Sequence, residues 1–553
     1  MKRLLVMLAS LSLLAACAAL PTEGPVNATR APTDTSQTVG LYANGPREGS
    51  SPEEIVSGFL TASGAGLAND FEVARQFLSR QASESWRPLD EVRIYSDARV
   101  PATTRTETQA VRLNLGSEGS LDQDGRFEPS SPDAVITTEF SLARNADGEW
   151  RIISLDNGLL ISATLFDSQY ERSVLHFLTA DSRYLVPDQR WFPHTTYATA
   201  AARELFQGPS PWLSDAVRTA IPSGTTVGSR GISISGGTAT VSLSDEAMSV
   251  TGYQRSLFGA QLEETLTLQS NVQNVEFMVD GAPWEITQSA SPSAYPFSDP
   301  QMVVNVNGQP SFYSDGTATS LTMSQVPEDV GSLAVGYGEN PTVVGVSGDR
   351  LVTLPNNGTA PVTLIEGEDI IDPSIDIYGW VWSGTSNDSD TIMAVTRDGQ
   401  QVPLSATFLR GGTVESIHVS REGARALVIW STESRMNMSA VSIIRDGGGN
   451  PVGLGDSLDL SAGIEEPIDA AWIDETTVAV LGTLPGGNNP GVYSVPIGGP
   501  VSSITEVASA VSITAGRGER SLVLATENGQ ILERSGGGWR LLITDGGSPA
   551  LPG

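Results

Sequence analysis

The chain has 553 residues, enough for about two to four domains, and its 64 acidic and 32 basic residues give a formal net charge of −32. So much negative charge repels phosphate backbones and anionic lipid headgroups, which argues against nucleic acid as a partner. The only cysteine is Cys17 and the only lysine is Lys2, which excludes an internal disulfide, a P-loop lysine and a Schiff-base lysine.

Residues 1–16 are typical of a secretory signal peptide, because two basic residues precede an apolar run from Leu4 to Leu14. That run is shorter than the roughly 20 apolar residues that a membrane span needs. It ends in Leu-Ala-Ala-Cys, which resembles the bacterial lipobox. The resemblance implies cleavage between Ala16 and Cys17, and it implies that Cys17 becomes an N-palmitoyl, S-diacylglycerol cysteine that anchors the chain. An ordinary signal peptide that contains a cysteine is the alternative.

Residues 17–50 are rich in Pro, Thr, Ser, Asn and Gly and show no apolar period, which is typical of a flexible tether. As a coil, such a tether would reach about 30–35 Å and let the folded part stand away from the membrane. Ser51 and Glu54 then have the spacing of a capping box, so a helix is expected to begin at Pro52.

An α+β domain is predicted over residues 51–172. Asn69 and Glu72 indicate a second helix, and alternation with period two then indicates strands around residues 111–115 and 136–142. Tight turns are expected at Asp124-Gly125, Asp147-Gly148 and Asn157-Gly158. Two helices followed by a curled antiparallel sheet resemble the cone-shaped nuclear-transport-factor-2-like fold.

A second domain, of the α/β class, is predicted over residues 173–290. Helices are expected at 199–206 and 253–268, and strands at 174–178, 231–235, 239–243 and 275–279. Four segments in this order resemble the recurring segments of the GerMN domain, a module of bacterial spore-germination and cell-envelope proteins. They are Leu205–Pro209, Ala220–Thr225, Gln261–Leu266 and Val279–Gly281.

Residues 300–553 are rich in glycine and short apolar strands, which predicts an all-β propeller of five or six blades. Inner strands are expected at Leu333–Val335, Gly379–Trp382, Ser416–Val419, Ala470–Ile473 and Val511–Thr514, and second strands at Ile392–Val395, Ala426–Trp430, Val478–Leu481 and Leu522–Ala525. Met302–Val306 is expected to complete the last blade. Val419–Arg425 resembles the strand–turn–strand motif of WD40-like propellers. One or two β-sandwiches are the alternative.

The sequence offers no catalytic, metal or cofactor site. The three histidines, His176, His194 and His418, lie far apart and have no second ligand at zinc spacing. His176 lies on an apolar strand and is expected to be a core residue. His418 lies in an inner strand that could line the channel, and a structural role is expected for it too.

Three further patterns are interpreted as structural. Asp122–Gly125 resembles a calcium loop only in part, so a hairpin turn is expected there. The adjacent pairs Glu263-Glu264 and Glu465-Glu466 diverge on a regular element and are expected at the surface. The tryptophans of the propeller could form a binding floor, but packing between blades is expected. They are Trp380, Trp382, Trp430 and Trp472.

The order of lipobox, tether, α+β domain, GerMN-like domain and propeller resembles the LpqB family of actinobacterial lipoproteins. The resemblance implies a non-enzymatic protein on the extracytoplasmic side of the cell membrane. It also implies a partner, the extracytoplasmic part of the sensor kinase of the MtrAB two-component system, which bears on cell-wall metabolism and division. The alternatives are an envelope hydrolase and a solute-binding sensor, each using the propeller or the GerMN-like groove.

Overall fold

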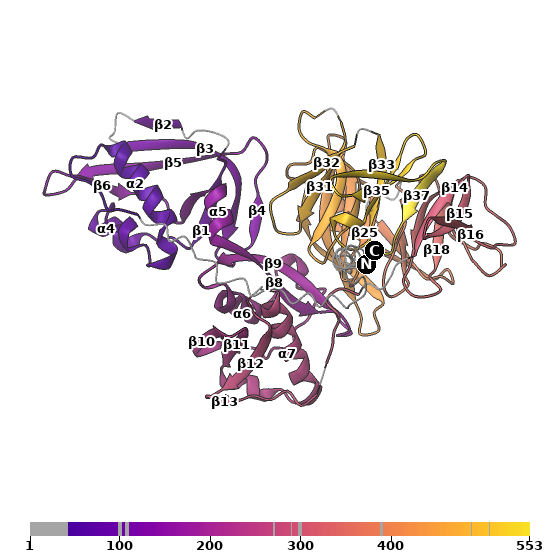
Figure 1. Ribbon diagram of the computed structural model, residues 1–553, viewed down its shortest axis with the longest axis horizontal. Helices are drawn as coiled ribbons and strands as arrows, with labels where there is room; N and C mark the ends of the chain where they lie inside the picture. The colour runs from indigo at the N-terminus through magenta and orange to yellow at the C-terminus, as the bar shows by residue number, and fades with distance from the viewer. Residues whose placement is uncertain are drawn as a thin grey trace, which may run out of the picture. The chain divides into compact units, whose positions relative to one another are not determined.

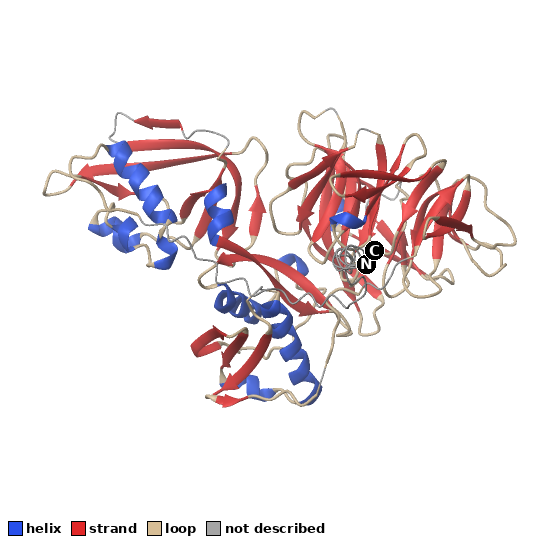
Figure 2. Cartoon of the chain, in the orientation of Figure 1, coloured by secondary structure: helices blue, strands red, loops and turns tan. Residues whose placement is uncertain are grey.

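The computed structural model describes residues 43–97, 102–105, 110–268, 271–288, 290–296, 301–386, 391–487, 489–507 and 509–553. The expected signal peptide, Cys17 and the tether up to residue 42 lie outside these residues. Figure 1 labels the helices and strands, and Figure 2 distinguishes them by colour. Among the described residues, no helix is both long enough and apolar enough to cross a membrane.

The first helix, α2 (Pro52–Gly64), begins where the capping box predicts. The amide of Glu54 donates to Ser51 Oγ at 3.3 Å, and the amide of Ser51 donates to Glu54 Oε2 at 2.7 Å. Ile55, Val56 and Phe59 form the buried face of the helix. The apolar stripe thus places α2 on the sheet of this domain, where it contacts three strands.

The prediction of one continuous second helix after Asn69 is wrong. The chain forms two short helices, α3 (Glu72–Arg75) and α4 (Arg80–Ser85). Phe71 precedes α3 in the left-handed conformation, with φ of 60°. Leu78, between the helices, forms a β-bridge with Ile152. The helix cannot continue because its backbone is used by the sheet at that point.

A seven-stranded sheet completes this domain, and its order is β6-β5-β3-β1-β7 with β2 and β4 attached to β3. Its strands are β1 (Glu91–Tyr95), β2 (Ala102–Arg105), β3 (Ala110–Asp122), β4 (Phe127–Pro129), β5 (Val135–Arg144), β6 (Trp150–Ser154) and β7 (Leu159–Ser162). Gly125, Gly148 and Gly158 have positive φ, which confirms the three expected turns. The β1–β7 pair is parallel, so the sheet is not wholly antiparallel.

The middle part of the chain follows α5 (Ala163–Gln169) and opens with a long hairpin, β8 (Tyr170–Leu178) and β9 (Leu185–Pro193). This part of the chain contains the two predicted helices, α6 (Tyr197–Gln207) and α7 (Gly252–Thr267), which pack against each other. A four-stranded sheet has the order β10-β11-β12-β13 and includes one parallel pair, β11–β12. Its strands are β10 (Val227–Ser235), β11 (Thr238–Leu243), β12 (Asn274–Val279) and β13 (Ala282–Pro283).

The rest of the chain forms six four-stranded sheets among the described residues, which confirms the propeller with six blades. The strands of the first three sheets are β14 (Met302–Val306), β15 (Gln309–Ser314), β16 (Thr317–Ser320) and β37 (Gly546–Ala550); β17 (Val330–Val335), β18 (Val343–Ser347), β19 (Arg350–Thr353) and β20 (Thr363–Glu366); and β21 (Ser374–Ile375), β22 (Val381–Ser383), β23 (Thr391–Val395) and β24 (Gln401–Ser405).

The other three sheets follow in chain order. They are β25 (Thr413–Val419), β26 (Arg425–Ser431), β27 (Met436–Arg445) and β28 (Pro451–Asp459); β29 (Glu466–Trp472), β30 (Thr477–Thr483), β31 (Gly491–Pro496) and β32 (Ser502–Glu506); and β33 (Ala510–Ala515), β34 (Leu522–Thr526), β35 (Ile531–Ser535) and β36 (Gly538–Ile543). Contacts between β17, β21, β25, β29, β33 and β37 make these the inner strands.

The two ends of the propeller sequence meet in one sheet. β14 pairs with β37, and Val303 lies opposite Ala550. β14 therefore completes a blade together with the C-terminal strand, as predicted for Met302–Val306. This pairing closes the ring and removes the two free sheet edges that an open array would expose.

One expected blade is shifted by one strand. The sequence predicts Gly379–Trp382 as an inner strand, but β22 (Val381–Ser383) is the second strand of its sheet and β21 (Ser374–Ile375) is the inner one. Ile392–Val395 is correspondingly the third strand. The inner strand has only two residues and follows Pro373, so it carries no alternation that a sequence pattern could detect.

Candidate functional site

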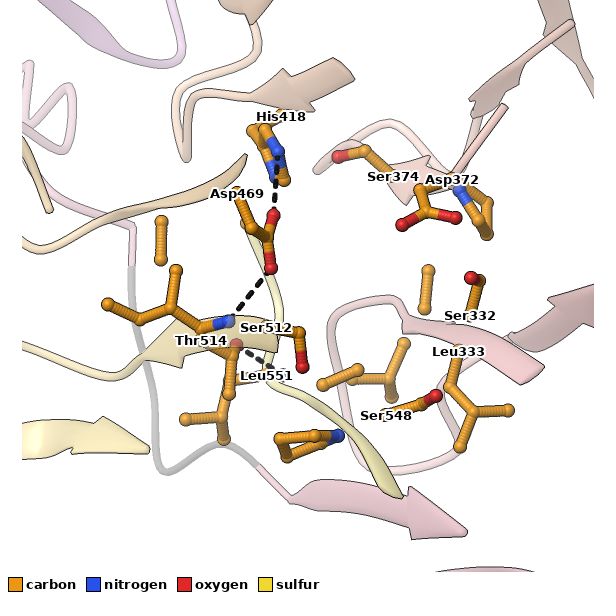
Figure 3. Close-up of a pocket in the computed structure, with 18 of the residues that line it drawn as sticks. Ser332, Leu333, Asp372, Ser374, His418, Asp469, Ser512, Thr514, Ser548 and Leu551 are labelled. Atoms are coloured by element: carbon orange, nitrogen blue, oxygen red, sulfur yellow. Dashed lines mark hydrogen bonds and ion pairs between the residues drawn. The ribbon is translucent and has the colours of Figure 1, made fainter. Parts of the chain in front are cut away.

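The inner strands of the six blades surround a cavity of about 100 Å³ on the channel axis (Figure 3). Its wall alternates small apolar residues with hydroxyl groups, two carboxylates and one imidazole. The polar members are Ser332, Asp372, Ser374, His418, Asp469, Ser512, Thr514 and Ser548. His418 lines this channel, as its place in an inner strand suggested.

The wall of the channel repeats from blade to blade. Each inner strand carries one serine or aspartate followed by a small or apolar residue. The pairs are Ser332-Leu333, Ser374-Ile375, Ser416-Ile417, Asp469-Ala470, Ser512-Ile513 and Ser548-Pro549. The sequence interpretation missed this repeat, although a polar residue that recurs once per blade is a signal that could have revealed the channel wall.

The charged part of the wall is built around Asp469. Its Oδ1 lies 3.3 Å from His418 Nε2, and its Oδ2 accepts a hydrogen bond of 2.8 Å from the amide of Ile513 (Figure 3). Ser416 Oγ also lies near His418 Nε2, at 3.1 Å. A nucleophilic triad needs the hydroxyl and the carboxylate on opposite nitrogens of the imidazole. Both contact the same nitrogen here, so this group has no triad geometry.

Polar side chains of the channel also join neighbouring blades. The amide of Val419 donates to Ser374 Oγ at 3.0 Å. The amide of Leu551 donates to Thr514 Oγ1 at 3.1 Å (Figure 3). With the bond from Ile513 to Asp469, three of the interfaces between inner strands are bridged. The polar residues therefore satisfy backbone donors at positions where regular strand pairing does not continue.

Asp372 is the second carboxylate of the channel. Burial raises its pKa above the ordinary value, and the nearby charge of Asp469 adds to that shift. The hydroxyl of Ser332 and the imidazole of His418 act in the opposite direction. No lysine or arginine is among the described residues that line the channel, so its polarity favours a ligand with a positive charge or with hydrogen-bond donors.

The remaining histidines lie outside the channel. His176 is fully buried, as predicted for a core residue, and its amide donates to Thr265 Oγ1 at 3.1 Å. Its Nε2 lies 3.5 Å from Glu475 Oε2, a contact that the sequence did not reveal. His194 Nδ1 lies 3.0 Å from Glu171 Oε2. The described residues contain no group of three or more His, Cys, Asp or Glu side chains that could hold a metal ion.

The other interpreted patterns have structural roles. Asp122 Oδ1 accepts hydrogen bonds from the amides of Asp124 and Arg126, which confirms the hairpin turn. Trp380, Trp382 and Trp472 are buried in apolar clusters shared by neighbouring blades, and Trp430 is partly buried against the first of them, which confirms the expected packing. None of the four lines the channel cavity, so they form no binding floor there.

The strand–turn–strand motif Val419–Arg425 is present between β25 and β26, and its polar side chains are buried. Arg425 Nε donates to Glu422 Oε1 at 2.8 Å, and its guanidinium lies 4.9 Å from the ring centroid of Trp472 in the next blade. Gly423 supplies the positive φ of the turn. The ion pair lies within one blade, and the Arg425 guanidinium links that blade to the next by stacking on Trp472 and donating to the carbonyl of Glu475 at 2.7 Å.

Three domain families match this sequence. Residues 45–167 match the family described as "Lipoprotein LpqB, N-terminal domain", residues 174–285 match "Sporulation and spore germination", and residues 314–552 match "Lipoprotein LpqB beta-propeller domain". These matches and the fold define a multidomain protein in which a GerMN domain follows an LpqB N-terminal domain and precedes a β-propeller. The chain belongs to the LpqB family.

Curated relatives named "Lipoprotein LpqB" match most of the chain. That of Thermobifida fusca is 27% identical over 543 residues, covering 85% of each chain, and that of Mycolicibacterium smegmatis is 25% identical and covers 100% of each. Among solved structures, the first GerMN domain of the sporulation protein GerM from Bacillus subtilis is 22% identical, with a TM-score of 0.19, covering 22% of this chain and 92% of that one.

Proposed function

We propose that the protein is a lipid-anchored, extracytoplasmic accessory protein. Its partner is the extracytoplasmic part of the sensor kinase of an MtrAB-like two-component system, through which it influences cell-wall metabolism and division. The observation that carries the proposal is the order of elements along one chain: a lipobox ending at Cys17, a tether, and three successive domains of the LpqB family. A tether of this kind lets the folded part meet a membrane protein in two dimensions.

A binding role fits the channel better than hydrolysis does. An envelope hydrolase needs a nucleophile and a base, or two carboxylates, arranged around one reacting bond. His418 Nε2 faces both Ser416 and Asp469, which leaves no hydroxyl aligned with a free imidazole nitrogen. We therefore assign the group formed by Ser416, His418 and Asp469 a non-catalytic role.

A solute-binding sensor is the second candidate, and the acidic channel favours it. A cavity of about 100 Å³ with Asp372 and Asp469 in its wall suits the amino group of a small cation. A small organic amine without a carboxylate is a suitable probe. A ligand that binds only the folded state raises stability by RT ln(1 + [L]/Kd), so a melting temperature that rises with this amine would favour this candidate over a purely protein-binding role.

Crosslinking in intact membranes tests the main proposal. A tagged full-length chain should recover a sensor kinase after crosslinking, and the Cys17→Ala chain should recover much less of it at equal expression. Deleting the gene should change the phosphorylation of the cognate response regulator. An unchanged phosphorylation level, together with no kinase in the crosslinked fraction, contradicts the proposal.

A further inference from the structure

A second and larger cavity, of about 610 Å³, lies in the GerMN domain, away from the propeller channel. It is a groove between helix α7, strand β12 and the segment that follows β13. α7 contributes Ser256, Ala260 and Glu263, and β12 contributes Val275–Met278. β13 contributes Pro283, and the segment after it contributes residues from Trp284 onward. Figure 1 shows α7, β12 and β13 next to one another in this part of the chain.

One edge of β12 is open along this groove. β11 pairs with β12 over the whole length Asn274–Val279, but β13 pairs only with Met278 and Val279 on the other edge. The amide of Trp284 then donates to the carbonyl of Phe277 at 2.8 Å, so Phe277 directs its backbone groups to that outer edge. Because backbone direction alternates along a strand, Val275 also faces outward. No described strand pairs there, which leaves a template for an added strand.

A buried donor lies beside this open edge. Trp284 lines the groove and is only 4% exposed, yet its indole Nε1 has no hydrogen-bond partner among the described residues. The ring is held by edge-on contacts with Phe258 and Phe277, at centroid distances of 5.3 and 5.9 Å. A buried donor without an acceptor is costly. The indole N–H is thus sealed within the wall of the groove, and the Trp284 ring supplies an apolar surface beside the open edge.

The rim of the groove carries three carboxylates, and Arg255 lies nearby, with its guanidinium 4.9 Å from the centroid of the Trp284 ring and donating to the carbonyl of Glu285. Glu263, Glu276 and Glu285 are exposed and line it, while the described lining residues include no lysine or arginine. Phe277, Ile286 and the Trp284 ring supply the apolar part of the wall. This combination suits a chain that carries basic side chains on one side and an apolar side chain on the other.

We propose that this groove binds an extended, basic peptide segment of a partner protein by strand addition to the outer edge of β12. The backbone of the segment pairs with the outward-facing backbone groups of Val275. An apolar side chain enters beside the Trp284 ring, and lysine or arginine side chains meet Glu263, Glu276 and Glu285. This inference does not depend on the kinase being the partner, because it concerns the chemistry of the segment alone.

Fluorescence anisotropy with the full chain in detergent tests the inference. The probe is a labelled eight-residue peptide that alternates valine and arginine. The same peptide with N-methylated valines keeps its charge and side chains but loses backbone donors, so it should bind about tenfold more weakly. This comparison needs no protein variant and is therefore independent of folding.

Two protein variants locate the site. The double change Glu276→Gln and Glu285→Gln should weaken binding about tenfold, because it removes two of the three rim charges. The matched control is Glu465→Gln with Glu466→Gln, an exposed acidic pair in the propeller that should leave affinity unchanged.

Equal binding of the N-methylated and unmodified peptides would overturn strand addition. An equal loss from the propeller control and the groove variant would show general attraction to an acidic protein, which also overturns the proposal. Circular dichroism and thermal melting of each variant establish that the fold is intact. A groove variant that has both the melting temperature and the peptide affinity of the wild type would count against this site.

Discussion

The imidazole of His418 and the carboxylate of Asp469 meet between neighbouring inner strands, with 3.3 Å between Nε2 and Oδ1. His418 lies in β25 and Asp469 in β29, and the same carboxylate accepts the amide of Ile513 in β33. One side chain therefore connects three consecutive blades. The most charged point of the channel wall is also a structural link in the ring.

Replacing Asp469 by asparagine tests this link. Asp469→Asn keeps the size of the side chain but removes the charge that faces His418, and its amide oxygen can accept only part of the present hydrogen bonds. Loss of a charge-assisted hydrogen bond costs about 1.5–3 kcal/mol of the free energy of unfolding. Urea denaturation should show a lower midpoint for this variant. Glu466→Gln, on an exposed position of the same strand, should change stability by less than about 0.5 kcal/mol.

The raised pKa of Asp372 predicts a dependence of stability on pH. The folded state binds this proton more tightly than the unfolded state does, because burial disfavours the carboxylate. The carboxyl therefore costs no stability below its ordinary pKa, and its cost grows as pH rises from there through the raised folded value. Asp372→Asn removes that cost. The variant should be more stable than the wild type at neutral pH, and the difference should vanish in acid.

Thermal melting of both proteins between about pH 3.5 and 7.5 measures this difference. A gap between the two melting temperatures that widens as pH falls would contradict the expected direction. Glu466→Gln again serves as the control, because its exposed carboxyl should give a gap that does not depend on pH in this way.

The elements that could be predicted from the sequence are those with a regular spacing of apolar residues or with a capping motif at one end. The capping box at Ser51 and the apolar stripe of α2 are local features, so they are visible in a single sequence. The inner strands β25 and β33 are rich in β-branched residues, and β29 contains the apolar segment Ala470–Trp472, so these strands were also found from local patterns. β21 was missed because its two residues follow a proline and owe their strand conformation to neighbours in the ring.

The sites depend on contacts that no sequence window contains. His418 and Asp469 are far apart in the chain and meet only because the ring closes, and His176 meets Glu475 in the same way. The helix expected from Asn69 failed for a related reason, since Leu78 gives its backbone to the sheet at Ile152. The groove beside Trp284 exists because no described strand pairs with the outer edge of β12 near Val275. Sequence periodicity does not show which strand edges are left unpaired.

The pairing of β14 with β37 predicts the effect of removing the last strand. A chain that ends at Thr544 lacks β37, which leaves the edge of β14 unpaired. It also loses the apolar contact between Val303 and Ala550. We expect loss of cooperative melting for the propeller and aggregation on size-exclusion chromatography. A synthetic peptide of residues 545–553 should restore cooperativity in part. A soluble, cooperatively melting truncated protein would show that this pairing does not close the ring.

The lipobox predicts that Cys17→Ala abolishes lipid attachment. One buried acyl chain holds a protein only marginally and two hold it firmly, at about 0.8 kcal/mol for each CH₂ group. The net charge of −32 gives no electrostatic attraction to anionic lipid that could compensate. The variant should be released to the medium, or it should remain as an uncut precursor held by the apolar run from Leu4 to Leu14.

In both cases metabolic labelling with a palmitate analogue should disappear, while the melting temperature of the folded part stays the same. Recovery of the kinase by crosslinking should fall, because confinement to the membrane no longer raises the effective concentration. Continued labelling of the Cys17→Ala chain would show that another residue carries the lipid.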